Sequence, residues 1–199
     1  MKTLSIIIVA VLLGAFLFSP HTTGPTEVGV RTIKWSLFGK KGVEDYVYQP
    51  GGVYFFPAVI NDWHVFDTKL QNVEMTHDPK RGDRPIRDDL LFKTVDGNDI
   101  SLDVIIAYRI DPQKAPYLLQ NVAGSDFELK DNIVRTIARS RSRDIFGELK
   151  TEEFYISDKR DEKAERVKDT LNEMRNPYGV IIERVSTKDY RFNPAYQKA

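Results

Sequence analysis

The chain has 199 residues, which is room for one globular domain with a substantial core and a short appendage. It carries 29 lysines and arginines and 29 aspartates and glutamates, and this zero net charge argues against a protein that binds nucleic acid. Cysteine is absent from the chain, which excludes disulfides, thiolate nucleophiles and cysteine-based metal sites within it.

The N-terminal residues form an uncharged apolar run from Leu4 to Phe18. As a helix it would span about 22 Å, short of a bilayer core of about 30 Å, a length typical of a signal peptide or a short anchor. Pro25 follows the small residues Thr22-Thr23-Gly24 and should hinder a signal peptidase, so we favour an uncleaved anchor over a cleaved signal peptide. The predicted membrane-spanning residues include Leu4, Ile8, Leu12 and Phe18.

In the part of the chain that follows, apolar and polar residues alternate as they do in β-strands. Residues 27–35, 53–56 and 65–75 are predicted strands, and a change of phase in the last of these indicates a bulge. The clearest alternation runs from Ile100 to Ile110, where apolar residues occupy every second position. Asp96-Gly97 comes just before it and is typical of a tight hairpin turn, which predicts a partner strand on its other side.

The segment from Thr76 to Asp88 contains two prolines and a glycine and is predicted to be a solvent-exposed loop. It ends at the acidic pair Asp88-Asp89, which could in principle supply a general acid and a general base. Adjacent residues on a strand point to opposite faces, so the two carboxylates could not act on one atom. We therefore interpret the pair as a solvated loop edge.

Helices are predicted over residues 115–121 and 126–146, and a third helix is predicted to begin at Ser157 as its cap, with Asp158 in its acidic first turn. The third helix carries an apolar stripe that we expect to pack on a sheet, formed by Ala164, Val167, Leu171 and Met174.

A last strand is predicted over residues 180–185, followed by a polar tail from Lys188. Strands, then helices, then one strand indicate an α+β domain, with an antiparallel-rich sheet and packed helices.

Five segments, in this order, resemble the SPFH/Band 7 domain shared by stomatin-like and prohibitin-like proteins. They are EVGVRTIKW at 27–35, QPGGVYFFPAVINDWHVFDTKLQNVEM at 49–75, FKTVDGNDISLDVIIAYRID at 92–111, IVRTIARSRSRDIFGELKTEEFYISDKRDEKAERVKDTLN at 133–172 and YGVIIERVSTKDYRF at 178–192. The resemblance divides the chain into an N-terminal membrane anchor (1–20), a linker (21–26), the SPFH/Band 7 domain (27–192) and the truncated start of a C-terminal helix (193–199).

The resemblance implies a membrane scaffold and not an enzyme, without catalytic, metal or cofactor residues. Family members assemble into rings or cages, organise lipid microdomains and modulate membrane AAA proteases. We therefore predict membrane lipid, copies of the chain or a paralogue, and a membrane AAA protease as partners, and no nucleic acid. The alternatives are a soluble exported binding module after signal-peptide cleavage and a regulatory subunit of a hydrolase.

Two signals for the orientation of the domain disagree. The single N-terminal anchor resembles that of prohibitin-related members and favours a domain on the non-cytosolic side of the membrane. The basic residues after the apolar run favour the cytosolic side by the positive-inside rule, and they are Arg31, Lys34, Lys40 and Lys41.

Arg135, Arg139 and Arg143 are spaced four residues apart and share one face of a predicted helix. They could contact anionic lipid or the carboxylates of another subunit, or they could form a solvated face that pairs with Asp131 and Asp144.

The remaining candidates are histidines and aromatic residues. His21, His64 and His77 have no metal-binding spacing, which argues against a zinc site, and a structural role is favoured for His64 in its predicted strand. The aromatics Tyr54, Phe55, Phe56 and Trp63 could contact the membrane or fill the core, and the sequence leaves both open.

Overall fold

The computed structural model of this chain describes residue 14, residues 19–36 and residues 39–192. The predicted anchor residues Leu4, Ile8, Leu12 and Phe18 lie outside the described residues, as does the predicted C-terminal helix start at 193–199. Within the described ranges, no helix has both the length and the apolar character needed to cross a bilayer. The chain forms two compact units: Met1–Lys69 with Ile110–Asp126, and Leu70–Arg109 with Phe127–Ala199.

The first unit is built from short antiparallel strands. Strand β1 (Ser19–Thr22) pairs with β4 (Val53–Phe56), and β2 (Glu27–Ile33) pairs with both β3 (Gly42–Val43) and β5 (Asn61–Asp67). The sequence analysis did not anticipate β1, because two prolines within six residues obscure a strand of four. A short 3₁₀ turn, η1 (Pro112–Lys114), and helix α2 (Ala115–Asn121) complete this unit.

The Trp63 ring on β5 lies directly over Gly29 of β2. A Cβ atom at Gly29 would come within 2.2 Å of the indole ring, so any side chain at this position would displace Trp63. This close approach anchors a group of aromatic rings on one face of the unit.

The second unit has a sheet around the long strand β8 (Asp99–Ile110). Strand β6 (Gln71–Met75) pairs with residues 104–108 of β8, β7 (Leu90–Lys93) pairs with residues 99–102, and both are antiparallel. Strand β9 (Val180–Phe192) also pairs with β8. The ion pairs Arg109–Glu183 and Arg191–Asp103 link the two strands in opposite order, which makes this pair antiparallel as well.

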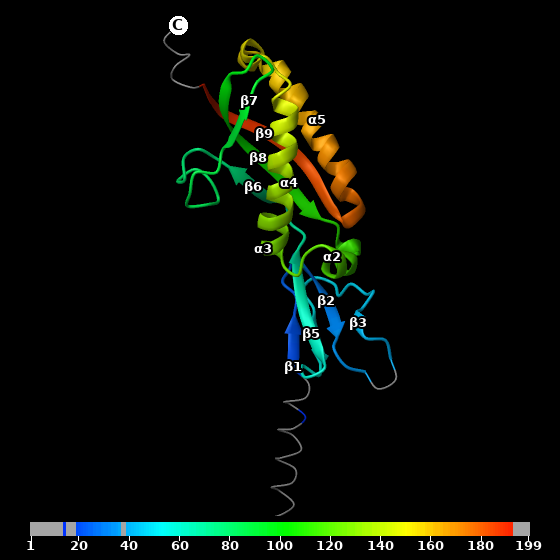
Figure 1. Cartoon of the computed structure of the whole chain (residues 1–199). Coiled ribbons are helices and arrows are strands. Elements are labelled where there is room, and N and C mark those ends of the chain that lie inside the picture. Colours follow the sequence, from blue (N-terminus) through cyan, green and yellow to red (C-terminus); the bar gives the residue numbers. More distant parts are fainter. Residues whose placement is uncertain (1–13, 15–18, 37–38, 193–199) are drawn as a thin grey trace, which may run out of the picture. The chain divides into compact units, whose positions relative to one another are not determined.

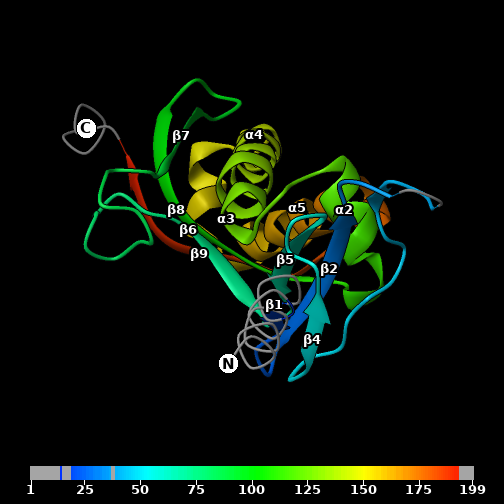
Figure 2. The same cartoon turned by 90° about the horizontal axis from the view of Figure 1, so that it is seen from below.

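The helical part of the second unit covers one face of this sheet (Figures 1 and 2). The helix predicted over 126–146 consists of α3 (Asp126–Glu128), a π-helical segment η2 (Leu129–Val134) and α4 (Arg135–Phe146). After a 3₁₀ turn, η3 (Thr151–Tyr155), α5 (Ser157–Arg175) packs on β9 and α4 and ends at η4 (Asn176–Tyr178).

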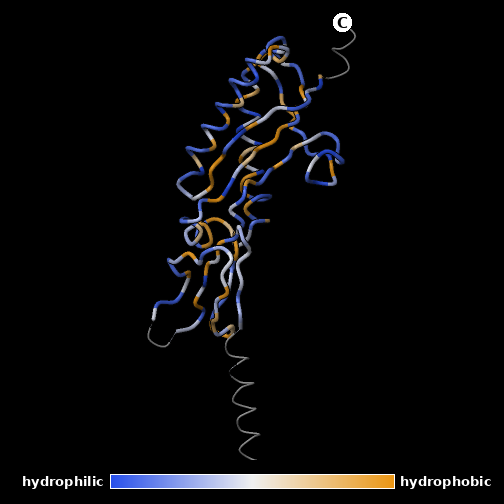
Figure 3. Tube along the Cα trace, turned by 180° about the vertical axis from the view of Figure 1, so that it is seen from behind, coloured by the Kyte–Doolittle hydropathy of each residue, from blue (hydrophilic) through white to orange (hydrophobic). Residues whose placement is uncertain are grey.

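Two apolar patterns in the sequence are confirmed as the core of this unit. Every second residue of β8 from Ile100 to Ile110 is at most 1% exposed. Helix α5 is largely hydrophilic along the tube of Figure 3, and its apolar stripe is buried at Ala164, Val167 and Leu171.

The predicted turn at Asp96-Gly97 is also confirmed. Gly97 has a φ of +87°, which favours glycine, and its N–H donates to the carbonyl of Thr94 at 2.9 Å.

Three predicted boundaries were wrong. The strand predicted over 65–75 is two strands, because β5 ends where the backbone N–H and hydroxyl of Thr68 both donate to Thr26 O, at 3.0 and 2.7 Å. Strand β9 extends to Phe192, where an ion pair holds Arg191 on β8. Ser157 is the first residue of α5 and not its cap, and no side chain caps that helix.

Candidate functional site

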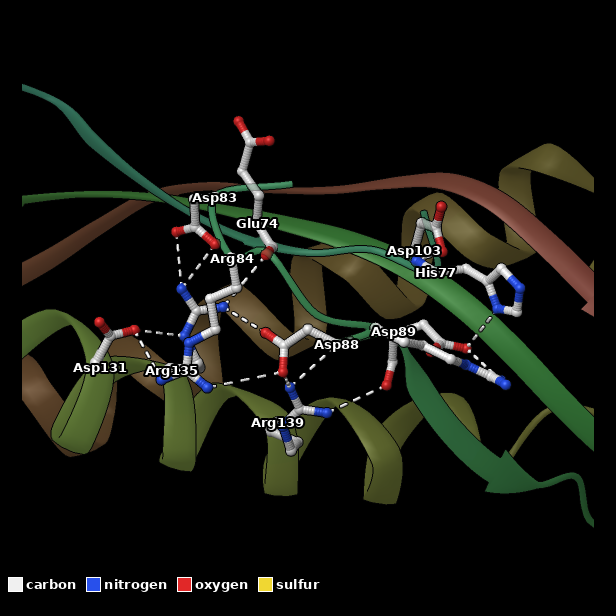
Figure 4. Close-up of polar contacts among 11 residues, drawn as sticks. Glu74, His77, Asp83, Arg84, Asp88, Asp89, Asp103, Asp131, Arg135 and Arg139 are labelled. Atoms are coloured by element: carbon white, nitrogen blue, oxygen red, sulfur yellow. Dashed lines mark hydrogen bonds and ion pairs between the residues drawn. The ribbon is translucent and has the colours of Figure 1, made fainter. Parts of the chain in front are cut away.

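A cluster of ion pairs in the second unit surrounds Arg135, the first residue of α4. Its side chain is only 3% exposed, although arginine is rarely buried without partners. The polar segment between β6 and β7 folds over this guanidinium and contributes two aspartates to it (Figure 4). The segment predicted to be a solvent-exposed loop is therefore bound to helix α4.

Each N–H of the Arg135 guanidinium has an acceptor. Nε donates to Asp131 at 2.8 Å, and Nη2 donates to both carboxylate oxygens of Asp83 at 2.8 and 2.7 Å. Nη1 donates to Asp88 at 2.6 Å and to the carbonyl of Glu74 at 3.2 Å. An arginine side chain has five N–H donors, so Arg135 is fully satisfied within the unit.

The interpretation of Asp88-Asp89 as a solvated edge was wrong. The two residues are 8% and 4% exposed. Their carboxylates do point in opposite directions, Asp88 toward Arg135 and Asp89 toward the hydroxyl of Ser101, as expected for adjacent residues (Figure 4). Sequence reasoning failed here because the arginine that compensates Asp88 lies 47 residues away.

Further basic groups close the network around the same carboxylates. Arg139 donates to the backbone carbonyls of Asp88 and Asp89 at 2.9 and 3.1 Å and also contacts the Asp88 carboxylate. Arg84 pairs with Asp131 at 3.0 Å, and Lys130 pairs with Asp83 at 2.8 Å. We call this set the clamp: Asp83, Arg84, Asp88, Lys130, Asp131, Arg135 and Arg139.

The clamp favours the ionised form of Asp83. Burial opposes ionisation of Asp83, but hydrogen bonds from Lys130 and Arg135 outweigh it and hold the pKa of this carboxyl below its ordinary value. Burial likewise opposes the charge of Arg135, and the bonds to Asp83 and Asp131 raise its pKa. A carboxyl with a lowered pKa that is bound to two cations is a poor proton acceptor, so Asp83 is suited to fixing the loop on helix α4.

The three arginines of the predicted stripe differ in burial. Arg135 is buried, Arg139 is half-buried, and Arg143 is exposed. Asp131 pairs with Arg135, as the solvated-face alternative supposed, but that pair is buried. Contact of the stripe with lipid or another subunit stays a prediction. Arg143 is the arginine of the stripe that is exposed to solvent.

The first unit holds the second cluster, an aromatic group around Trp63. The ring of His21 lies 5.6 Å from Trp63 and 5.9 Å from Phe56, and Tyr48 lies 5.1 Å from Trp63. Phe55 of the same strand points away and is 62% exposed. Of the two alternatives for these aromatics, Phe56 therefore packs inside the aromatic group, whereas the adjacent Phe55 points outward.

The histidines lie in different settings. His64 Nδ1 is 3.3 Å from the carbonyl of Gly124, and His77 Nδ1 is 3.4 Å from Asp89. Across residues 19–36 and 39–192, no group of three or more histidine or acidic side chains is arranged to hold a metal ion.

The order of strands and helices, and the match of one family model, fix the family. A model of the SPFH domain / Band 7 family matches residues 21–199. The chain belongs to this family. SPFH/Band 7 proteins commonly associate with membranes and oligomerise. In this SPFH domain the clamp fixes the segment between β6 and β7 on helix α4.

Replacing Arg135 with methionine should remove the clamp's centre and leave three carboxylates without their shared partner. Loss of one partner from a buried ion network costs about 3–5 kcal/mol, and we expect the free energy of unfolding to fall by this amount. Urea unfolding of the full chain in uncharged detergent, followed by circular dichroism, measures it. The control is Arg143→Met on the same helix, expected to change stability by at most about 0.5 kcal/mol. An equal loss of unfolding free energy in the two variants would contradict the stabilising role of the clamp.

The lowered pKa of Asp83 predicts an acid-sensitive contribution to stability. A carboxyl whose folded pKa is depressed stabilises the fold above the unfolded pKa of about 3.9, and this stabilisation is lost as the pH falls through the folded pKa. Asp83→Asn should therefore be less stable than the wild type at pH 7, with the difference narrowing below about pH 4. Unfolding curves between pH 2 and pH 7 measure the difference. A difference in stability that stays constant across this pH range would show that ionised Asp83 does not stabilise the fold. The control is Asp144→Asn, at an exposed carboxyl.

Proposed function

We propose that this SPFH domain is a membrane-anchored scaffold that assembles with copies of itself or a paralogue. In this proposal the apolar run at residues 4–18 fixes the chain at the bilayer. Assembly then organises membrane microdomains or modulates a membrane AAA protease. Membership of the SPFH/Band 7 family supports the class of function, and the geometry of the first unit supports contact with the membrane.

The observation that carries the proposal is the register of β1 against β4. Ser19, the first residue after the apolar run, pairs with Phe56, the last residue of β4. Directly paired residues of antiparallel strands have Cα atoms about 4.5–5.5 Å apart. The chain therefore leaves the predicted anchor beside the turn at residues 57–60, which joins β4 to β5.

The same end of the first unit exposes apolar side chains. Phe55 and Val59 are each 62% exposed, and Trp35 is 52% exposed. Trp35 belongs to this end because the N–H of its neighbour Lys34 donates to the carbonyl of Ile60 at 2.8 Å. Tryptophan is enriched at the boundary between lipid head groups and hydrocarbon, and surfaces that lie in this boundary combine tryptophan and phenylalanine with lysine.

Self-assembly would use charged surfaces left free by the clamp. Arg143 of α4 is exposed, and α5 exposes acidic residues along its outer side, among them Asp161, Glu162 and Glu165. An ion pair between Arg143 of one copy and an acidic residue of the next is the contact we propose, since opposite surface charges steer and orient association.

The two tryptophans are natural reporters of membrane contact. We expect Trp63→Phe, which keeps Trp35, to give fluorescence that lipids brominated near the head group quench strongly. Trp35→Phe, which keeps Trp63, should be quenched little, because Trp63 packs on Gly29 within the aromatic group. The measurement uses the full chain reconstituted in vesicles.

Equal and weak quenching of both variants would refute contact of this end with the membrane. The reference is a chain that lacks both native tryptophans and carries tryptophan in place of Val95, which is 66% exposed in the second unit. Quenching of this reference as strong as that of Trp63→Phe would also count against a contact specific to this end of the first unit.

Membrane fractionation of the full chain in its native host tests the anchor itself. We expect the protein to resist carbonate extraction at full mass, and protease protection of intact vesicles then identifies the side of the membrane. A shorter species that washes off would mean a cleaved signal peptide and would favour the soluble exported binding module.

A further inference from the structure

Strand β9 has a long outer edge on the side away from β8. At 13 residues it is the longest strand in the described part of the chain, and among the strands described there it pairs with β8 alone. A strand at the edge of a sheet presents backbone N–H and C=O groups that can pair with another chain. Which residues of β9 present such groups follows from the register of the sheet.

The backbone groups of β8 are divided between its two neighbours. The N–H of Thr94 donates to the carbonyl of Asn98 at 3.0 Å where β7 turns into β8. Backbone groups of alternate strand residues point to the same edge, so the even-numbered residues of β8 face β7 and the odd-numbered residues face β9.

The outward residues of β9 are therefore the even-numbered ones. Both ion pairs between the two strands, Arg109–Glu183 and Arg191–Asp103, join odd-numbered residues. Residues opposite each other in an antiparallel pair share a face of the sheet, so odd-numbered residues of β9 lie opposite odd-numbered residues of β8 and bond to them. The even-numbered residues of β9 then point their N–H and C=O groups away from β8.

Helix α5 confirms this direction at one residue and leaves the next ones open. The N–H of Ile182 donates to Oδ1 of Asn172 at 2.8 Å, and Nδ2 of Asn172 donates to the carbonyl of Ile182 at 2.9 Å. The side-chain amide thus bonds both outward groups, as a neighbouring strand would. Residues 19–36 and 39–192 supply no such partner to the outward backbone groups of Arg184, Ser186, Lys188 and Tyr190.

Basic side chains lie along this open edge. Arg184 and Lys188 are exposed, and within the described ranges neither forms an ion pair. They are four residues apart and share one face of β9. The acidic residues of the same strand, Glu183 and Asp189, lie on the opposite face and pair with other arginines. The open edge therefore carries two cations that the chain itself does not neutralise by an ion pair.

These charges disfavour a second copy of β9 at the edge. Two antiparallel copies would pair even-numbered residues with even-numbered residues, which brings Arg184 and Lys188 of both copies onto one face of the joined sheet. Like charges on neighbouring strands are destabilising, and charged side chains on an edge are a common protection against such pairing. A strand that carries acidic residues would gain from the same two cations.

We propose that the edge of β9 from Arg184 to Tyr190 binds an extended segment of a partner protein as an added antiparallel strand. Backbone hydrogen bonds to the outward groups provide the attachment. Two acidic residues of the partner, four positions apart and opposite Arg184 and Lys188, provide the selectivity. This binding requires neither the membrane anchor nor assembly, so it goes beyond the proposed scaffold function.

Amide NMR of the full chain in uncharged detergent micelles tests the proposal. The probe is acetyl-Thr-Val-Glu-Val-Thr-Val-Glu-Val-Thr-amide, compared with the same peptide carrying glutamine or lysine at both glutamate positions. We expect saturable shifts of the amides of Ser186 and Lys188 with the glutamate peptide. Their exchange with solvent should also slow, because both N–H groups gain an acceptor. The glutamine peptide should bind about three- to tenfold more weakly.

The double variant Arg184→Glu, Lys188→Glu should reverse the preference and bind the lysine peptide more tightly than the glutamate peptide. Both residues are exposed, so the fold should stay intact. The matched control is Arg143→Glu, at an exposed arginine of α4, which should bind like the wild type.

Equal binding of the glutamate and glutamine peptides by the wild type would overturn the proposal. Saturable shifts without slower exchange of the amides of Ser186 and Lys188 would also overturn it, because the peptide would then not be an added strand. Protection of these two amides that rises with the concentration of the chain, without peptide, would overturn it in favour of a second copy.

Discussion

The buried guanidinium of Arg135 is the constraint on which the second unit depends. It joins the first residue of α4 to Asp83 and Asp88 of a segment that has no strand or helix of its own. A buried charge is tolerated only when it is paired and hydrogen-bonded, so the segment cannot leave Arg135 without a large cost in free energy. The ion pairs of Arg135 therefore fix the course of the chain from β6 to β7.

That fixed path also positions Arg87 and His77 at a groove of about 430 Å³ that is lined by residues of β7, β8 and β9. Asp88 is held by α4, and the adjacent Asp89 points the other way, where it orients Arg87 and accepts from Ser101. His77, at the other end of the segment, is held by its backbone N–H, which donates to Asp103 at 2.9 Å. The clamp and this groove thus share one segment, with Asp88 on one side and Arg87 on the other.

The sequence predicted those parts of the fold that local patterns determine. The alternation in β8, the Asp96-Gly97 turn and the apolar stripe of α5 each depend on neighbours in the chain, and all three are confirmed. The break between β5 and β6 depends instead on the contact of Thr68 with Thr26, 42 residues away. Periodicity carries no information about such a partner.

The candidate site was less predictable than the fold. The spacing of Arg135 and Arg139 placed them correctly on one helix face, but surface exposure was the ordinary expectation for such residues. A usable signal was present in the chain: three aspartates in seven residues, at 83, 88 and 89, just before a strand. Acids that are buried beside an apolar strand need a cation as partner, and the helix that carries Arg135, Arg139, Arg141 and Arg143 is rich in cations.

The most direct test of the clamp is amide hydrogen exchange in the segment from His77 to Asp89 of the full chain in micelles. The amides of His77 and Asp88 donate to Asp103 and to the carbonyl of Thr76, both at 2.9 Å. We expect these two amides to be protected nearly as strongly as those of β8, and to lose that protection in Arg135→Met under conditions where β8 stays protected. Exchange at the rate of an unstructured loop in the wild-type chain would contradict the account.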